Sequence, residues 1–63
     1  MYEGIVRTID HEEGIGYIQE MDDSRIMFMI DNVSGPLEEE DKVTYDIETK
    51  PTRQAVNVSR IGS

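Results

Sequence analysis

The chain has 63 residues, with no cysteine and a single histidine. This length suits one small domain, and the absence of cysteine excludes disulfide bridges and thiolate metal sites. Six Lys and Arg residues stand against 14 Asp and Glu residues, and the resulting formal net charge of −8 opposes nonspecific attraction to phosphate backbones.

Hydrophobic residues make up 37% of the chain, which is too much for an obviously disordered tail. No apolar run is long enough to span a membrane. The first residues also lack the basic and then apolar pattern of a signal peptide. We therefore expect a cytoplasmic protein with no membrane contact.

Short segments rich in β-branched and alternating apolar residues predict an all-β fold. Strands are expected near 2–10, 14–20, 25–30, 42–48 and 54–61. The expected core consists of Val6, Ile18, Ile26, Phe28, Val33, Val43, Tyr45, Ile47, Val56 and Val58. No disulfide can stabilise this small domain, so its stability must come from the fold itself. We expect the strands to close into a barrel, because closure removes exposed sheet edges.

The second and third segments carry apolar side chains on both faces. Alternation places Ile15 and Tyr17 on one face of their strand, and Met27 and Met29 on one face of theirs. Phe28 points to the opposite side and is expected in the core. Only one face can fill the core, so the second apolar face is expected to contact a ligand, a partner or loops of the same chain.

The acidic segments 10–13 and 38–41 are interpreted as solvated turns and loops. A metal site or an acid–base pair at 10–13 is the less favoured alternative. The sequence contains no nucleophile motif, phosphate-binding loop or paired catalytic constellation. We therefore predict no enzymatic activity, no cofactor and no metal site.

Several motifs in order resemble a bacterial cold-shock protein. Met1–Arg7 is similar to the start of the family's sequence. Gly14–Ile18 resembles the family's first RNA-binding motif, and Ile26–Ile30 falls where its second belongs. Val43–Ile47 and Gln54–Val58 resemble the family's last strands. The resemblance covers essentially the whole chain. It implies a single cold-shock-like domain over residues 1–63, folded as a five-stranded antiparallel OB-fold barrel of the cold-shock-domain type. It also implies binding of single-stranded RNA or DNA.

Cold-shock proteins stack bases on outward aromatic rings, helped by nearby Lys and His. Here Tyr17 keeps a ring and Arg7 keeps a positive charge. Other side chains replace the family's rings and cations at Thr8, Ile9, Glu13, Ile15, Met27, Met29 and Ile30. Because each stacked base contributes about 1–3 kcal/mol, we expect weak binding or an altered specificity.

The candidate nucleic-acid-binding residues are Arg7, Ile9, Ile15, Tyr17, Met27, Met29 and Ile30. The alternative is an acidic protein-interaction module or a homodimer, which would use the face of Ile15, Tyr17, Met27 and Met29. Methionine suits such an adaptable partner surface, and this outward apolar face is expected to continue with Ile9. A third interpretation is that loops of the same chain cover this face.

Overall fold

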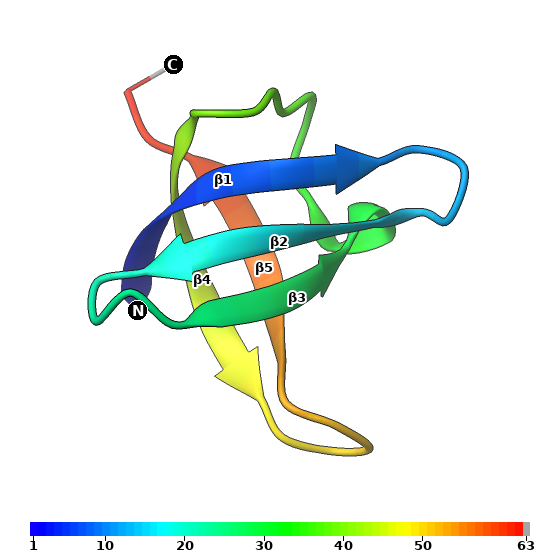
Figure 1. The fold of residues 1–63 in the computed structure, drawn as a ribbon, viewed down its shortest axis with the longest axis vertical. Helices are drawn as coiled ribbons and strands as arrows, with labels where there is room; N and C mark the ends of the chain where they lie inside the picture. The colour runs from blue at the N-terminus through cyan, green and yellow to red at the C-terminus, as the bar shows by residue number, and fades with distance from the viewer. Residues whose placement is uncertain (63) are drawn as a thin grey trace.

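The computed structural model describes residues 1–62, and these residues form a closed five-stranded barrel. Figure 1 shows β1, β2 and β3 side by side in front of β4 and β5. The elements are β1 (Tyr2–Asp10), β2 (Ile15–Glu20), β3 (Arg25–Met29), the 3₁₀ turn η1 (Ile30–Asn32), β4 (Lys42–Glu48) and β5 (Gln54–Arg60). The predicted all-β OB-type barrel is confirmed, and each predicted strand end lies within one residue of the observed end.

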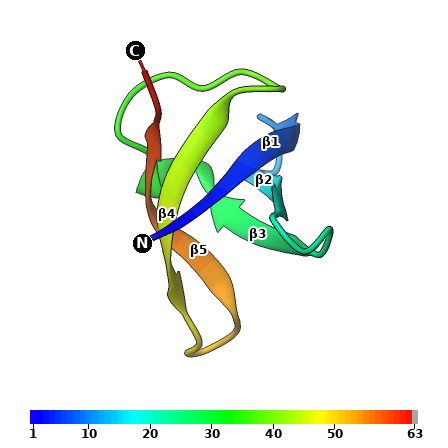
Figure 2. The ribbon, with the colours of Figure 1, turned by 90° about the vertical axis from the view of Figure 1, so that its left-hand side faces the viewer.

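The barrel closes in the order β1-β2-β3-β5-β4. Four of the neighbouring pairs are antiparallel, and β3 and β5 close the circle as a parallel pair through Phe28 and Ala55. The long connection from β3 to β4 passes over the upper end of the barrel (Figure 2). No helix within residues 1–62 is long and apolar enough to cross a membrane.

Inward side chains from all five strands form one core. Its fully buried members are Val6, Ile18, Ile26, Phe28, Val43, Tyr45, Ala55 and Val58. Val33 and Ile47, both predicted in the core, are partly buried and pack against its rim. Seven of the predicted core residues are therefore fully buried, and Ala55 is a member that the prediction omitted.

The prediction for Val56 was wrong, and the reason is a β-bulge in β5. Thr44 pairs with Ser59, whereas Asp46 pairs with Val56, so β5 contains one extra residue between the two pairs. Asn57 within the bulge has φ +53°, a left-handed conformation that asparagine tolerates better than most residues. The bulge reverses the alternation, so Val56 faces outward.

A second bulge lies in β1. Val6 pairs with Ile18 and Thr8 pairs with Tyr17, so β1 advances two residues while β2 advances one. Beyond this bulge the inward residue is Ile9, which packs against the core. The bulge therefore changes which side of the sheet the end of β1 presents.

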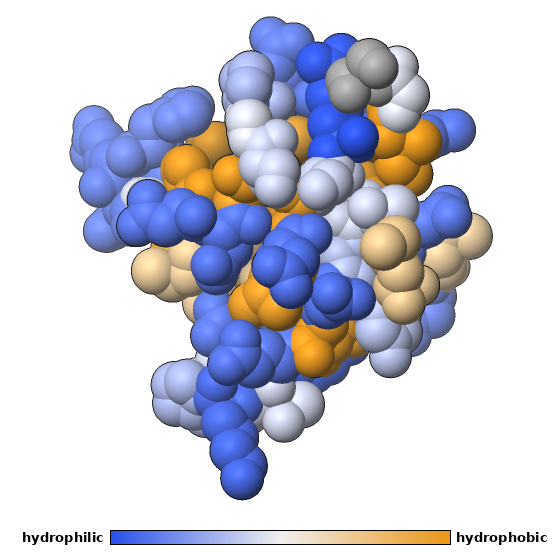
Figure 3. Space-filling view, turned by 180° about the vertical axis from the view of Figure 1, so that it is seen from behind, coloured by the Kyte–Doolittle hydropathy of each residue, from blue (hydrophilic) through white to orange (hydrophobic). Residues whose placement is uncertain are grey.

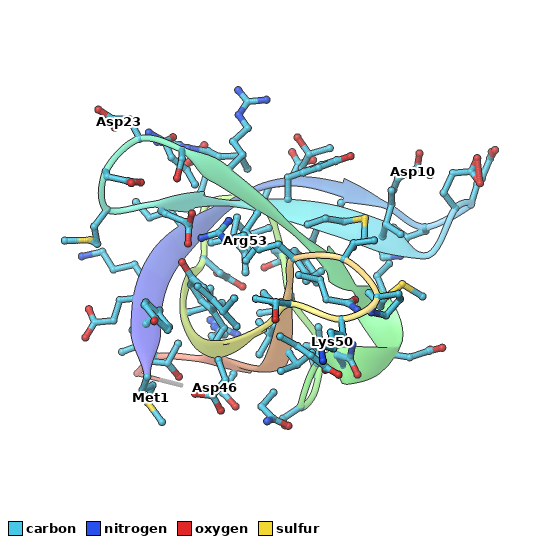
Figure 4. The ribbon with its side chains drawn as sticks, turned by 90° about the horizontal axis from the view of Figure 1, so that it is seen from below. Met1, Asp10, Asp23, Asp46, Lys50 and Arg53 are labelled. Carbon is cyan, nitrogen blue, oxygen red and sulfur yellow. The ribbon has the colours of Figure 1, made fainter. Side chains whose placement is uncertain are left out.

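A polar network closes the end of the barrel opposite the β3–β4 connection. The carboxylate of Glu20, with a side chain 9% exposed, accepts hydrogen bonds from Arg53 at 3.0 Å, Ser24 at 2.7 Å and Tyr45 at 3.1 Å. Figure 4 looks onto this end, with Arg53 near its centre. Burial and the Glu20 carboxylate both raise the pKa of Tyr45, so its hydroxyl remains a donor.

The network predicts that stability depends on pH through Glu20. Burial alone would raise the pKa of Glu20, but hydrogen bonds from Ser24, Arg53 and Tyr45 outweigh it and lower the pKa below 4.5. The stabilisation is thus complete above pH 4.5 and is lost as the pH falls through the lowered folded-state value. Glu20→Gln should cost about 1–2 kcal/mol at pH 7 and less below pH 4.

Urea unfolding at several pH values measures this difference. The control is Glu48→Gln, because Glu48 is exposed and lies at the end of β4. If Glu20→Gln and wild type differ equally at pH 7 and pH 3, the carboxylate does not supply the pH dependence.

Candidate nucleic-acid interface

The outward side of β2 and β3 carries an apolar surface, here called the outer patch, made of Ile15, Tyr17, Met27 and Met29. Tyr17 pairs across the strands with Met27, and Ile15 pairs with Met29. Directly opposed side chains lie on the same face of a sheet, so the four form one continuous surface. Tyr17 is 38% exposed and Met29 is 39% exposed, while Ile15 and Met27 are half-buried. No loop within residues 1–62 fully covers Tyr17 or Met29.

The next row along the same face is polar. Gln19 of β2 pairs with Arg25 of β3, and Arg25 is exposed. Within residues 1–62, Arg25 forms no ion pair and no side-chain hydrogen bond. Sequence reasoning missed Arg25, although its position two residues before Met27 places it on the same face by alternation.

Arg7 projects from the β1 bulge and is already engaged. Its Nε–H donates to Gln19 Oε1 at 2.7 Å, and its Nη1 lies 2.5 Å from Glu40 Oε2. The Arg7 side chain is 36% exposed, so it can still be reached from solvent. Its charge, which the resemblance implied for contacting nucleic acid, is therefore balanced by a carboxylate of the same chain.

The structure does not place Ile9 and Ile30 on the outer face. Both are partly buried and pack against the core. With Phe28, Val33 and Leu37 they line an apolar hollow of about 150 Å³ beneath the β3–β4 connection. The prediction that Ile9 extends the outer patch was wrong, because the bulge in β1 turns its side chain inward.

Acidic side chains lie at both ends of the sheet that carries the patch. Asp10 pairs with Ile15 at one edge, and Figure 4 shows Asp10 and Asp23 at opposite ends of the three-stranded sheet. Viewed from behind, on the β4 and β5 side, hydrophilic side chains cover most of the surface and hydrophobic ones show as separate areas (Figure 3). Residues 1–62 contain no group of three or more His, Asp or Glu side chains that could hold a metal ion.

The arrangement supplies one exposed ring, apolar contacts beside it, and a cation at the border. Thr8 is exposed next to Tyr17 on β1, and Met27 lies on the other side of the ring on β3. A planar group laid on Tyr17 would contact Met27, and a negative group beside it would lie near Arg25. Such a surface suits an unpaired base attached to a phosphate.

The closed five-stranded OB-type barrel is the fold of a cold-shock domain. No protein-family model matches the sequence, and no curated protein sequence matches it. Among solved structures, Drosophila Unr CSD456, which contains cold-shock domains, superimposes with a TM-score of 0.82 at 19% sequence identity. The match covers 95% of this chain and 26% of the Unr chain, so this chain spans about a quarter of that structure.

Proposed function

We propose that this protein binds single-stranded RNA or DNA on the outer patch, as the resemblance of its motifs to bacterial cold-shock proteins implies. The observation that carries the proposal is the exposed ring of Tyr17, set between Thr8 and Met27 in the middle of the sheet. Base stacking on exposed aromatic rings is the common means by which OB folds hold single strands.

Each residue has a distinct role in this proposal. Tyr17 stacks on a base, while Ile15, Met27 and Met29 supply apolar contact to neighbouring bases and sugars. Arg25 pairs with a phosphate. Ile9 and Ile30 act indirectly, by packing behind the strands that present the patch.

The expected binding is weak for two reasons. Only one ring is available for stacking on the patch, and the net charge of −8 repels the polyanion. With Arg25 as the main phosphate contact, the logarithm of the affinity should fall with the logarithm of salt concentration with a slope of about −0.7.

The second candidate is a protein contact on the same surface, either with a foreign partner or with a second copy. The observation that favours it is that three of the four outer-patch side chains are aliphatic or thioether groups, while Arg7 is paired with Glu40. Sedimentation equilibrium tests self-association: a mass that rises with concentration supports a homodimer, and a monomer at high concentration counts against it.

Tyr17→Ala tests the leading proposal. Loss of the ring should weaken binding to a fluorescently labelled oligo-dT or oligo-U at low salt by about tenfold, because stacking contributes about 1–3 kcal/mol per base. Fluorescence anisotropy measures the affinity, and circular dichroism checks that the variant is folded.

The matched control is Tyr2→Ala. Tyr2 is 53% exposed and stacks on Tyr45 with ring centroids 5.8 Å apart, away from the outer patch. This variant should retain wild-type affinity. Absence of wild-type binding at low salt, or equal affinities of wild type and Tyr17→Ala, would refute the proposal.

A further inference from the structure

The connection between η1 and β4 ends in an acidic loop, residues 38–41, that is hydrogen-bonded to β1. The Glu40 N–H donates to the Val6 carbonyl at 2.7 Å, and the Val6 N–H donates to the Asp41 carbonyl at 2.9 Å. Within the loop, the Glu38 N–H donates to Asp41 Oδ2 at 2.9 Å. These bonds hold the loop against the β1 bulge.

Two carboxylates of the acidic loop cover donors on β1. Glu40 pairs with the Arg7 guanidinium, and Glu39 Oε2 accepts from the Ile9 N–H at 3.4 Å. The two donors lie on either side of Thr8, which is adjacent to Tyr17. Guanidinium groups and backbone N–H groups are also the donors that proteins commonly use to hold nucleic-acid phosphates.

The backbone of Glu40 is itself unusual. Its φ of +76° lies in the left-handed region, where glycine is more stable than a residue with a side chain. Non-glycine residues in this region occur more often at functional sites. A glutamate at this position forgoes the conformational advantage of glycine and places a carboxylate against Arg7.

We propose that the acidic loop is an internal phosphate mimic that competes with nucleic acid for Arg7 and the Ile9 amide. This inference rests on the proposed function and concerns the regulation of the same site. While the loop is docked, Arg7 is neutralised, so a strand gains little from it. When a phosphate displaces Glu40, the freed loop leaves Arg7 and Arg25 on one border of the outer patch.

Glu40→Gln tests the proposal, because it removes the competing charge and retains the size of the side chain. We expect about fivefold tighter binding to oligo-dT than wild type. The salt slope should become steeper by about 0.7, as one more cation meets a phosphate. Glu48→Gln is the control, because it changes the net charge equally at an exposed position outside the loop.

Glu40→Gly is a second variant, which removes the carboxylate and suits the left-handed backbone. If either Glu40 variant binds more tightly than Glu48→Gln with a steeper salt slope, the inference is supported. If wild type binds and all variants bind alike, the inference fails while the proposed function stands. If neither the wild type nor any variant binds oligo-dT at low salt, the proposed function fails and the inference fails with it.

A readout without nucleic acid tests the contact itself. The Arg7 side-chain Nε–Hε resonance should shift in Glu40→Gln relative to wild type and to Glu48→Gln. An unchanged resonance would show that Glu40 does not hold Arg7 in solution, and it would overturn the inference.

Discussion

Phe28→Ala should lower the free energy of unfolding by about 3–5 kcal/mol, as expected when a fully buried ring is removed. Phe28 is 1% exposed and belongs to the core shared by all five strands. A chain of this length is expected to have a total stability of only about 3–9 kcal/mol. The substitution should therefore remove at least about a third of the total stability, which circular dichroism during thermal and urea unfolding will detect.

Tyr17→Ala is the matched comparison for this substitution. It removes a ring from the neighbouring strand, but from the outward face, where Tyr17 is 38% exposed. Its cost in stability should be below about 1 kcal/mol, while its cost in binding is the larger effect. Equal destabilisation by the two substitutions would contradict the assignment of inner and outer faces.

Gly16→Ala should lower the free energy of unfolding by about 1–3 kcal/mol through overpacking. A Cβ at this position would lie 2.5 Å from Phe28 Cζ and 2.7 Å from the carbonyl oxygen of Thr8. The Phe28 ring is held by the core, and the carbonyl belongs to the β1 bulge. Movement of the ring would disturb the core, and movement of the carbonyl would disturb the pairing of β1 with β2. Urea unfolding measures the cost.

A double-mutant cycle with Phe28→Leu tests the cause of this cost. The smaller side chain relieves the ring contact, so Gly16→Ala should cost less in the Phe28→Leu background than in wild type. The contact with the Thr8 carbonyl remains and keeps part of the penalty. Strict additivity of the two substitutions would mean that the Phe28 ring is not the obstacle.

The strands were predictable because most of them follow simple alternation. Val43, Tyr45 and Ile47 all point inward along β4, as their spacing indicates. Gly16 within a strand pattern indicates a bend or a close approach of neighbouring atoms. The structure shows the close approach, because Phe28 and the Thr8 carbonyl leave no room for a side chain at this inward position of β2. Its presence was informative, but the neighbours that require it lie on other strands.

The errors arose where a bulge reverses the alternation. Val56 was expected inside and Ile9 outside, and the bulges in β5 and β1 exchange those orientations. A bulge adds one residue to one strand, so its position depends on the pairing partner and not on local propensity. Asn57, with φ +53°, is compatible with a bulge, but an asparagine in the sequence does not by itself predict one.

The candidate site was predictable in part. Alternation correctly placed Ile15, Tyr17, Met27 and Met29 on one face, which the register of β2 and β3 confirms. The pairing of Arg7 with Glu40 joins residues 33 positions apart and has no local signature. The participation of these residues in binding stays a prediction.

The most direct test is a ¹H–¹⁵N NMR titration with a short oligo-dT at low salt. The largest shifts should fall on β2 and β3, at Tyr17, Met27 and Arg25, with smaller ones along β1 and the acidic loop. Resonances of β4 and β5 should remain nearly unchanged. Shifts centred on β4 and β5, or no shifts at millimolar oligonucleotide, would contradict binding at the outer patch.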